Sequence, residues 1–214
     1  TIGTAVAQFA DGENTVTMDA TLAAAGTIAV VGGTDAEDVT ISAAAEGTIS
    51  LLLGDGDNVI DLADLAATAE VSVVLGAGDD EVSIDTGASG AEAVIDFGTG
   101  ENTLKPDAEA DFSDMTLTMS NLDIIELTAT TAGDDNTDAT FKAASLDGQS
   151  YEIVGGGVTS GVLTDEIGAE IADGAGSFDA SSLQLSNGLN TGVKGMVVTF
   201  ADNDENKDTT VTLT

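Results

Sequence analysis

The sequence contains no cysteine, no histidine and no arginine. Without cysteine there is no disulfide, so a folded secreted protein needs another stabilising element or a hydrophobic core large enough to be stable without a disulfide. Without all three residue types, most nucleophile–base pairs and oxyanion-binding arrangements are excluded. A glycosidase with two carboxylates is chemically feasible, but no pair stands out among 39 acidic residues, and aromatic residues are scarce at 3%. We therefore expect no enzyme.

Positive charge is also scarce, because four lysines oppose those 39 acidic residues and the net charge is −35. Nothing in the chain neutralises phosphates, so no nucleic-acid partner is expected, and an anionic membrane surface would repel it. No apolar run approaches the roughly 20 residues of a membrane span, so no membrane insertion is expected. No signal peptide is visible and the first residue is not Met, which indicates a removed N-terminal segment or a piece of a longer chain.

What the sequence does contain is typical of closely stacked short strands. Apolar residues make up 42% of the chain, which is too many for a disordered polymer. There are 26 glycines but a single proline. Such a composition indicates strands joined by tight turns rather than an ordinary globular enzyme.

A repeat of 22 residues runs through the first half of the chain. Five apolar residues, each closing a strand-like run and preceding a turn signal, lie 22 apart: Phe9, Val31, Leu53, Leu75 and Phe97. The turns that follow are residues 10–14, 54–58, 76–80 and 98–102, and a second copy at 32–38 carries a one-residue slip. Each repeat therefore contains a strand, a turn, a second strand and a second turn.

Apolar residues spaced by two follow each turn and predict a strand with one buried face. Their first column is Val16, Val39, Ile60, Val82 and Leu104. Two short strands cannot bury a core alone, but coils stacked roughly 4.8 Å apart can. We predict an all-β fold: a β-solenoid, or β-roll-like stack, of about five 22-residue two-strand coils over residues 1–106. Pro106 cannot donate to a ladder and is expected to end this run.

Residues 107–214 form a second, less regular β region in this interpretation. Residues 115–119 and 124–128 are strand-like, with a turn at 121–123, and a short helix is expected near residues 165–169. Residues 200–213 resemble 9–18, so the chain ends in half a coil, while residues 1–9 resemble the other half. Either a longer solenoid was cut here or subunits stack head to tail.

The repeated turns carry Gly-x-Gly followed by acidic or amide residues, a pattern suited to calcium. Glycine lets backbone carbonyls turn inward, and calcium takes six to eight oxygen ligands. A stacked column of carboxylates also repels itself without a counter-ion. The candidate metal ligands are Asp11, Glu13, Asn14, Asp35, Asp38, Asp55, Asp57, Asn58, Asp79, Asp80, Glu101 and Asn102. The alternative is a plain β-turn that uses these residues for backbone reasons, and the repeat and the charge favour the metal.

Two other acidic groups carry weaker expectations. We interpret Asp134, Asp135 and Asp138 as a solvated loop. The group Asp202, Asp204 and Glu205 is either a terminal metal site or a solvated tail, and the sequence leaves both interpretations open.

Residues 75–82 resemble the glycine- and aspartate-rich nonapeptide of RTX proteins, written G-G-x-G-x-D-x-U-x. Residues 9–16, 53–60 and 97–104 resemble it with asparagine in the aspartate place. The resemblance implies calcium-binding β-rolls and export by type I secretion, and such repeats also occur in bacterial surface-layer (S-layer) proteins. Residues 120–128 are similar to linking segments of those surface-layer proteins. Unlike RTX rolls, this chain repeats every 22 residues and carries the motif on one edge only.

These observations lead to an expected function at the cell surface, outside the cell. The chain is expected to be a calcium-stabilised structural subunit of a surface layer, sheath or filament. Its expected partners are copies of itself, in a head-to-tail oligomer or a lattice, and cell-surface polysaccharide. The alternative is a calcium-binding RTX-type repeat module of a larger secreted adhesin or enzyme. A polysaccharide-acting or ice-binding solenoid is a third interpretation.

Overall fold

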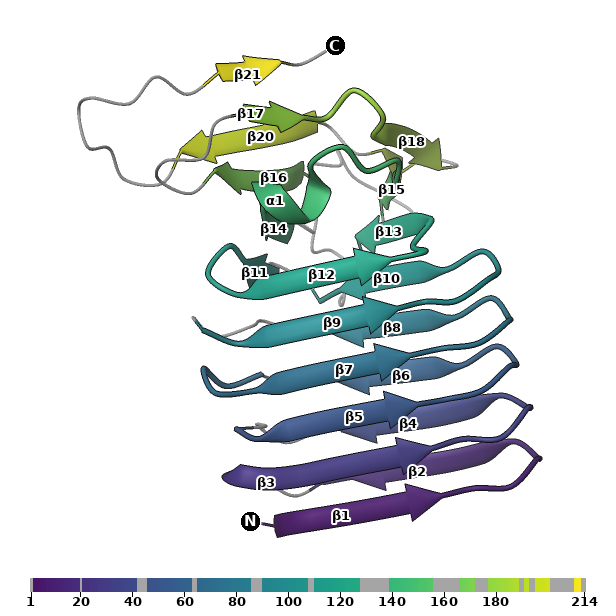
Figure 1. Ribbon diagram of the computed structural model, residues 1–214. Coiled ribbons are helices and arrows are strands. Elements are labelled where there is room, and N and C mark those ends of the chain that lie inside the picture. Colours follow the sequence, from purple (N-terminus) through teal and green to yellow (C-terminus); the bar gives the residue numbers. More distant parts are fainter. Residues whose placement is uncertain are drawn as a thin grey trace.

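The computed structural model describes residues 2–19, 21–41, 46–62, 65–85, 90–107, 110–127, 139–155, 166–171, 177–188, 191–192, 195–200 and 210–212. In this part the chain is almost entirely parallel β-sheet, with a short helix, α1 (Ala143–Leu146). Coils of roughly 22 residues stack on one another from the N-terminus upward (Figure 1). The predicted all-β solenoid is therefore confirmed.

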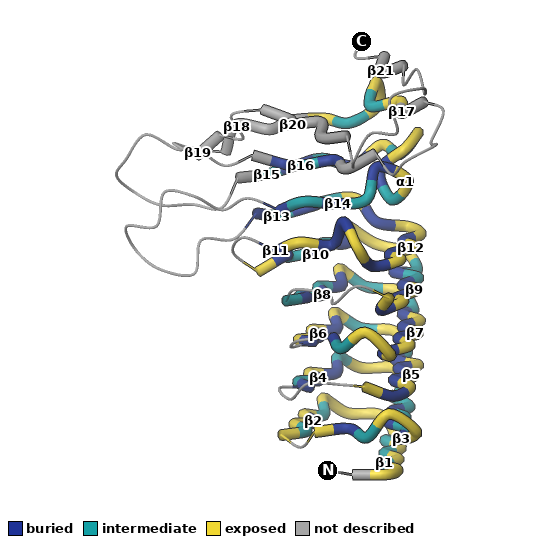
Figure 2. The backbone as a smooth tube through the Cα atoms, turned by 90° about the vertical axis from the view of Figure 1, so that its left-hand side faces the viewer, coloured by how far each residue is buried: buried dark blue, intermediate teal, exposed yellow. Residues whose placement is uncertain are grey.

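Two long sheets face each other across each coil. The first sheet contains β1 (Ile2–Gln8), β3 (Leu22–Val31), β5 (Thr48–Leu52), β7 (Glu70–Val74), β9 (Glu92–Asp96) and β12 (Thr116–Ser120). The second sheet contains β2 (Asn14–Met18), β4 (Glu37–Ile41), β6 (Val59–Leu62), β8 (Glu81–Ile84), β10 (Thr103–Pro106), β13 (Ile124–Leu127), β15 (Glu152–Gly155), β18 (Gln184–Gly188) and β19 (Thr191–Gly192). Figure 2 shows the stack from its edge, with the two sheets side by side.

A third sheet joins the stack in the C-terminal half. It contains β11 (Ala110–Phe112), β14 (Ala139–Lys142), β16 (Glu166–Ile171) and β20 (Gly195–Phe200), while β17 (Ser177–Asp179) pairs with β21 (Thr210–Thr212). The helix expected near residues 165–169 is wrong, because this segment is strand β16. Ile167 and Ala169 are both buried and lie two residues apart, which is the period of a strand.

The core lies between the sheets and follows the predicted alternation. Val39, Ile60 and Val82 stand in register on neighbouring strands and are 0% exposed. Ile49 is likewise fully buried and pairs with Val71 one coil later. Because every second side chain of each strand points inward, the coils build one continuous apolar core.

One column of the predicted repeat is shifted by a residue. Val31 pairs with Leu52 rather than Leu53, and Gly32 takes the position that Leu53 holds in the next coil. The register between β1 and β3 changes between the pairs Ile2–Leu22 and Thr4–Thr27. From Thr27 to Ile41, the second coil therefore lies one residue further along the chain than a spacing of 22 predicts.

Both long sheets continue beyond Pro106. This proline is the last residue of β10 and pairs with Ile84. Strands β12 and β13 then extend the first and second sheets by a further coil. The acidic groups predicted at Asp134, Asp135 and Asp138, and at Asp202, Asp204 and Glu205, lie outside the described residues. No helix in the described part of the chain has the length and apolar character to cross a membrane.

Candidate functional site: the glycine–aspartate edge

The repeated Gly-Asp turns stack along one edge of the solenoid, where each strand of the first sheet passes into the second (Figure 1, right). We call this the glycine–aspartate edge and define it as residues 10–14, 32–37, 54–58, 76–80 and 98–102. The turns of successive coils are linked by backbone hydrogen bonds. The amide of Gly76 donates to the carbonyl of Gly54 at 3.1 Å, and that of Thr99 donates to Gly76 at 2.8 Å.

Close stacking explains the glycines of the motif. A Cβ on Gly54 would lie 1.6 Å from the carbonyl oxygen of Gly33 in the coil below. Gly100 has a φ of +146°, and a Cβ there would lie 1.8 Å from the carbonyl oxygen of Gly78. No larger residue fits at these positions without moving a neighbouring turn.

Inside the edge, one residue of each coil points into a polar column in which amides and carboxylates alternate. The column, which we call the carboxamide–carboxylate ladder, consists of Asn14, Glu37, Asn58, Asp80, Asn102 and Asp123. Four backbone amides each donate to the side-chain oxygen of the next residue up: Glu37 to Asn58 at 3.0 Å, Asn58 to Asp80 at 2.9 Å, Asp80 to Asn102 at 3.1 Å, and Asn102 to Asp123 at 3.0 Å.

The side chains of Asn14 and Asn58 each close their own turn and also contact a carboxylate, whereas the Nδ2 of Asn102 donates to the carbonyl of Asn121 at 3.0 Å. The Nδ2 of Asn58 lies 2.8 Å from Asp80 Oδ1, 2.9 Å from the carbonyl oxygen of Gly56 and 3.2 Å from that of Gly54. In the first coil, the Nδ2 of Asn14 donates to Gly12 and to Glu37 Oε1 in the same manner. The amides therefore satisfy inward carbonyls that a metal ion would otherwise satisfy.

The carboxylates of the ladder are less well satisfied. Glu37 and Asp80 are each only 1% exposed, yet Glu37 Oε2 and Asp80 Oδ2 have no hydrogen-bond partner. Burial raises the pKa of Asp80, and the nearby charges of Asp57 and Asp79 act in the same direction, against hydrogen bonds from Asn58. A buried carboxylate oxygen of this kind is satisfied chemically by a proton or by a cation.

The outer carboxylates of the edge bind the backbone of the next coil. Asp55 Oδ1 accepts the amide of Ala77 at 3.0 Å, and Asp57 Oδ1 accepts that of Asp79 at 2.9 Å. Asp79 Oδ1 in turn accepts the amide of Glu101 at 2.8 Å. All these side chains are exposed, so each carboxylate holds two coils together while facing solvent.

The structure brings eleven of the twelve predicted ligands to this edge. The inner position is taken by Asn14, Asn58, Asp80 and Asn102, and the exposed outer positions by Asp11, Glu13, Asp35, Asp55, Asp57, Asp79 and Glu101. The placement of Asp38 at the edge is wrong. Asp38 is an exposed residue of β4 that pairs with Thr15 and Val59 on the outer face of the second sheet, because the slip moves it one residue out of the turn.

Sequence reasoning missed two members of the ladder, Glu37 and Asp123. Glu37 lies 23 residues after Asn14 and 21 before Asn58, so a strict count of 22 lands on Ala36 instead. Asp123 lies 21 residues after Asn102. The available signal was an acidic residue within one position of each expected place.

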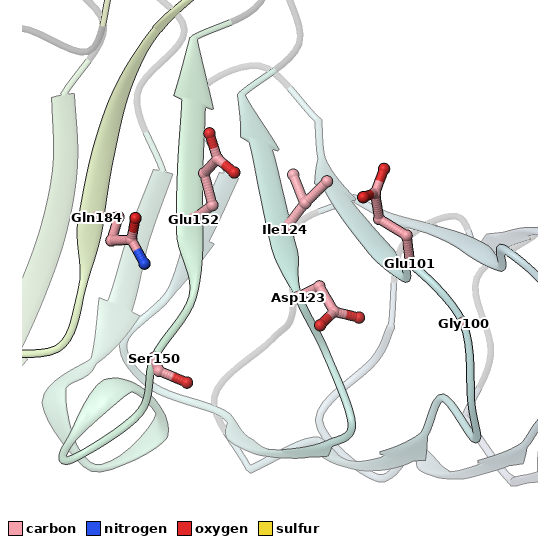
Figure 3. A pocket seen from close by; sticks show the side chains of 7 residues that line it. All are labelled: Gly100, Glu101, Asp123, Ile124, Ser150, Glu152 and Gln184. Atoms are coloured by element: carbon pink, nitrogen blue, oxygen red, sulfur yellow. The ribbon is translucent and has the colours of Figure 1, made fainter.

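The edge continues into an open cleft of about 400 Å³ beside β13 and β15, shown in Figure 3. Its lining residues are Gly100, Glu101, Asp123, Ile124, Ser150, Glu152 and Gln184. The carboxylates of Glu101, Asp123 and Glu152 come from successive coils and do not point toward one centre (Figure 3). Across the described residues, no three acidic side chains converge closely enough to enclose a metal ion.

Calcium binding at this edge therefore stays a prediction, and the geometry shows which oxygen atoms would have to bind the ion. Ligation would use the unpartnered oxygens of Glu37 and Asp80 or the exposed outer carboxylates, with side chains rotating toward the ion. Comparison with family models, with curated proteins and with solved structures finds no match to this chain.

Proposed function

We propose that the chain is a calcium-stabilised structural subunit of an extracellular assembly, such as a surface layer, sheath or filament, and that it performs no catalysis. The observation that carries this proposal is the glycine–aspartate edge. There, exposed carboxylates repeat in every coil around a ladder that leaves oxygens of Glu37 and Asp80 buried and unpartnered.

Electrostatics support the calcium part of the proposal. Asp57 and Asp79 occupy equivalent positions in neighbouring coils, which lie about 4.8 Å apart, in a chain of net charge −35. Such a column destabilises the folded state through self-repulsion. Calcium bound to the outer carboxylates would offset this repulsion without displacing the Asn58 amide from its carbonyls.

The concentration range of calcium supports a role outside the cell. Extracellular calcium modules often bind at about 10⁻⁴–10⁻³ M, so millimolar calcium would stabilise the solenoid after export. At the low free calcium inside a cell, the repulsion would persist and the chain would stay loose. Repeating coils in turn supply a scaffold suited to self-association, and the exposed polar side chains of the second sheet, such as Asp38 and Asp61, suit contact with cell-surface polysaccharide.

Melting temperature and particle size with calcium, magnesium or chelator test this proposal. We expect millimolar calcium to raise the melting temperature by several degrees and to produce sheets or filaments under the electron microscope. The double variant Asp57→Asn, Asp79→Asn should lose most of the calcium-induced increase. The matched control is the double variant Asp38→Asn, Asp61→Asn, which removes the same two charges from the outer face of the second sheet and should retain the calcium-induced increase. A melting temperature and a particle size that do not respond to chelator overturn the proposal.

Light scattering distinguishes the alternative function. A chain that gains stability in calcium but remains monomeric at high concentration supports a calcium-binding module of a larger secreted adhesin or enzyme. A chain that forms particles in calcium and releases them in chelator supports the structural subunit.

A further inference from the structure

Turns of the glycine–aspartate edge bind the turn above them through two hydrogen bonds placed around a glycine. The amide of Gly56 donates to the carbonyl of Ala77 at 2.7 Å, and the carboxylate of Asp57 accepts the amide of Asp79 at 2.9 Å. The residue between these two contacts is Gly78, where a Cβ would lie 2.3 Å from the carbonyl oxygen of Gly56. We call the glycine amide and the carboxylate of the next residue the turn clamp.

The turn clamp repeats one coil higher. The amide of Gly78 donates to the carbonyl of Thr99 at 2.9 Å, and the carboxylate of Asp79 accepts the amide of Glu101 at 2.8 Å. The residue between them is Gly100, where a Cβ would lie 1.8 Å from the carbonyl oxygen of Gly78. A turn clamp therefore binds the C=O before a glycine and the N–H after it, and leaves no room for a side chain at the glycine.

The sixth coil has a shorter turn and does not cover the fifth. Residues 97–102 connect β9 to β10, whereas residues 121–123 connect β12 to β13 in the coil above. Asn121 makes the shorter turn with a φ of +60°, and its Nδ2 lies 2.7 Å from Asp96 Oδ1. The turn of the fifth coil therefore projects beyond the coil that follows it.

Gly100 and Glu101 form an open turn clamp at this projection. The φ of Gly100 is +146°, close to the +153° of Gly78, so the two glycines have a similar backbone conformation. Within the described segments, no residue accepts from the amide of Gly100 or donates to the carboxylate of Glu101. Both residues line the open cleft of about 400 Å³ (Figure 3).

We propose that this open turn clamp and its cleft bind a short glycine-containing segment of a basic partner protein. The amide of Gly100 donates to the C=O before the partner's glycine, and the carboxylate of Glu101 accepts the N–H after it. Unpaired backbone groups of this kind are a common template for main-chain recognition of a peptide. The inference goes beyond the proposed calcium-stabilised assembly and does not depend on it.

Charge decides which partner fits the cleft. Of its seven lining residues, Glu101, Asp123 and Glu152 are acidic and none is basic. The net charge of −35 adds to the negative potential, so lysine or arginine beside the partner's glycine is attracted. A bare cation cannot accept the hydrogen bond of the Gly100 amide, whereas a basic peptide supplies both the carbonyl and the positive charge.

A second copy of this chain does not fit the open turn clamp. Its turn 10–14 does carry a glycine of positive φ, Gly12 at +119°, between two acidic residues. Stacking that turn on Gly100 in register would place β1 and β2 where β12 and β13 already lie (Figure 1). Its acidic side chains would also face Glu101. The partner is therefore a loop or chain end of a different protein.

Two capped heptapeptides of equal charge test the inference by fluorescence anisotropy, in chelator and at about 0.15 M salt. Both have lysine on either side of the central residue, which is glycine in one and alanine in the other. We expect the alanine peptide to bind at least tenfold more weakly, because its Cβ meets the turn below. Equal affinities would show that charge alone attracts the peptides, and would overturn the inference.

Variants of the chain locate the binding. Glu101→Ala should weaken the glycine peptide at least fivefold. The matched control Glu13→Ala removes the same charge from the equivalent place in the first coil and should bind as the unmodified chain does. In nuclear magnetic resonance spectra, the amide signal of Gly100 should move downfield when the peptide binds, and that of Gly12 should not.

Three other results would overturn the inference. Equal losses in Glu101→Ala and Glu13→Ala would mean that no particular turn is recognised. A glucosamine oligomer that binds as tightly as the glycine peptide, and depends equally on Glu101, would assign the cleft to a polysaccharide. Self-association that is lost in Glu101→Ala and kept in Glu13→Ala would assign the open turn clamp to a second copy.

Discussion

Asn58 binds one oxygen of Asp80 twice: its side-chain Nδ2 lies 2.8 Å from Asp80 Oδ1, and its backbone amide lies 2.9 Å from the same atom. The other oxygen of Asp80 is buried and has no partner. The two residues occupy equivalent places in adjacent coils, yet the amide of Asn58 reaches the carbonyls of its own turn and a carboxylate has no hydrogen to donate. This asymmetry leads to the first two predictions.

Asp80→Asn should stabilise the chain in calcium-free buffer by about 1–2 kcal/mol. The new Nδ2 could donate to the carbonyls of Gly76 and Gly78, as Asn58 does one coil earlier, while the remaining oxygen still accepts from Asn58. Urea unfolding in chelator measures the change. The control Asp79→Asn alters an exposed side chain and should shift stability by less than about 0.5 kcal/mol. A destabilised Asp80→Asn would show that the buried charge is itself required.

The stability difference between the unmodified chain and Asp80→Asn should depend on pH. Burial raises the pKa of Asp80 above its usual value of 3.8 in the folded chain. The folded state therefore favours the protonated form, and the stabilising contribution of that proton is fully present below the unfolded pKa and lost as the pH rises through the folded pKa. Thermal unfolding in chelator from neutral pH down to about pH 4 should show the two proteins converging. A gap that widens on acidification contradicts the assignment.

Asn58→Asp should destabilise the chain by about 3 kcal/mol or more. The substitution would place three carboxylates in adjacent coils, with Glu37 below and Asp80 above, and would remove the donor that serves Gly54 and Gly56. Thr17→Asp adds the same charge to an exposed position of β2 and is the matched control. Chemical denaturation of both variants measures the difference, and similar losses would mean that general repulsion matters more than the ladder.

Gly54→Ala should destabilise the chain by at least about 2 kcal/mol, because its Cβ would lie 1.6 Å from the carbonyl oxygen of Gly33 and would force two coils apart. Gly3→Ala meets no atom within 4 Å and should be nearly neutral. Melting temperatures of the two alanine variants provide the test. A stable Gly54→Ala would show that the turns separate easily.

The fold could be predicted from the sequence because the same alternation of apolar and polar residues repeats in each coil. Val39, Ile60 and Val82 alternate with polar residues at a fixed interval, and period-two burial repeated in each coil specifies a stacked sheet. The place of Val31 was wrong because an irregularity in β3 between Leu22 and Thr27 leaves every later position of the second coil one residue away from a count of 22, and turn residues alone do not show where a shift begins. The helix expected near residues 165–169 was wrong because pairing with β14 and β20 decides the conformation of β16.

The candidate site could be predicted only in part. The composition of the turns located the edge and its carboxylates. It did not show that the side chains of Asn14 and Asn58 donate to neighbouring carboxylates and that of Asn102 to the carbonyl of Asn121, since such pairs appear only once the coils are in register. Asparagine at these positions, which looks like a weakened metal ligand in one repeat, is a hydrogen-bond donor in the stack.

The alternation of the ladder also limits how a solenoid of this kind can change length. Removing the coil that carries Asn58 would join Glu37 directly to Asp80, and duplicating the coil that carries Asp80 would likewise set two carboxylates together. Duplicating an asparagine coil, or removing a carboxylate coil, keeps each acid beside an amide. Coils are therefore not interchangeable units. Whether the insertion or deletion of a coil is tolerated depends on whether that coil carries an asparagine or a carboxylate in the ladder.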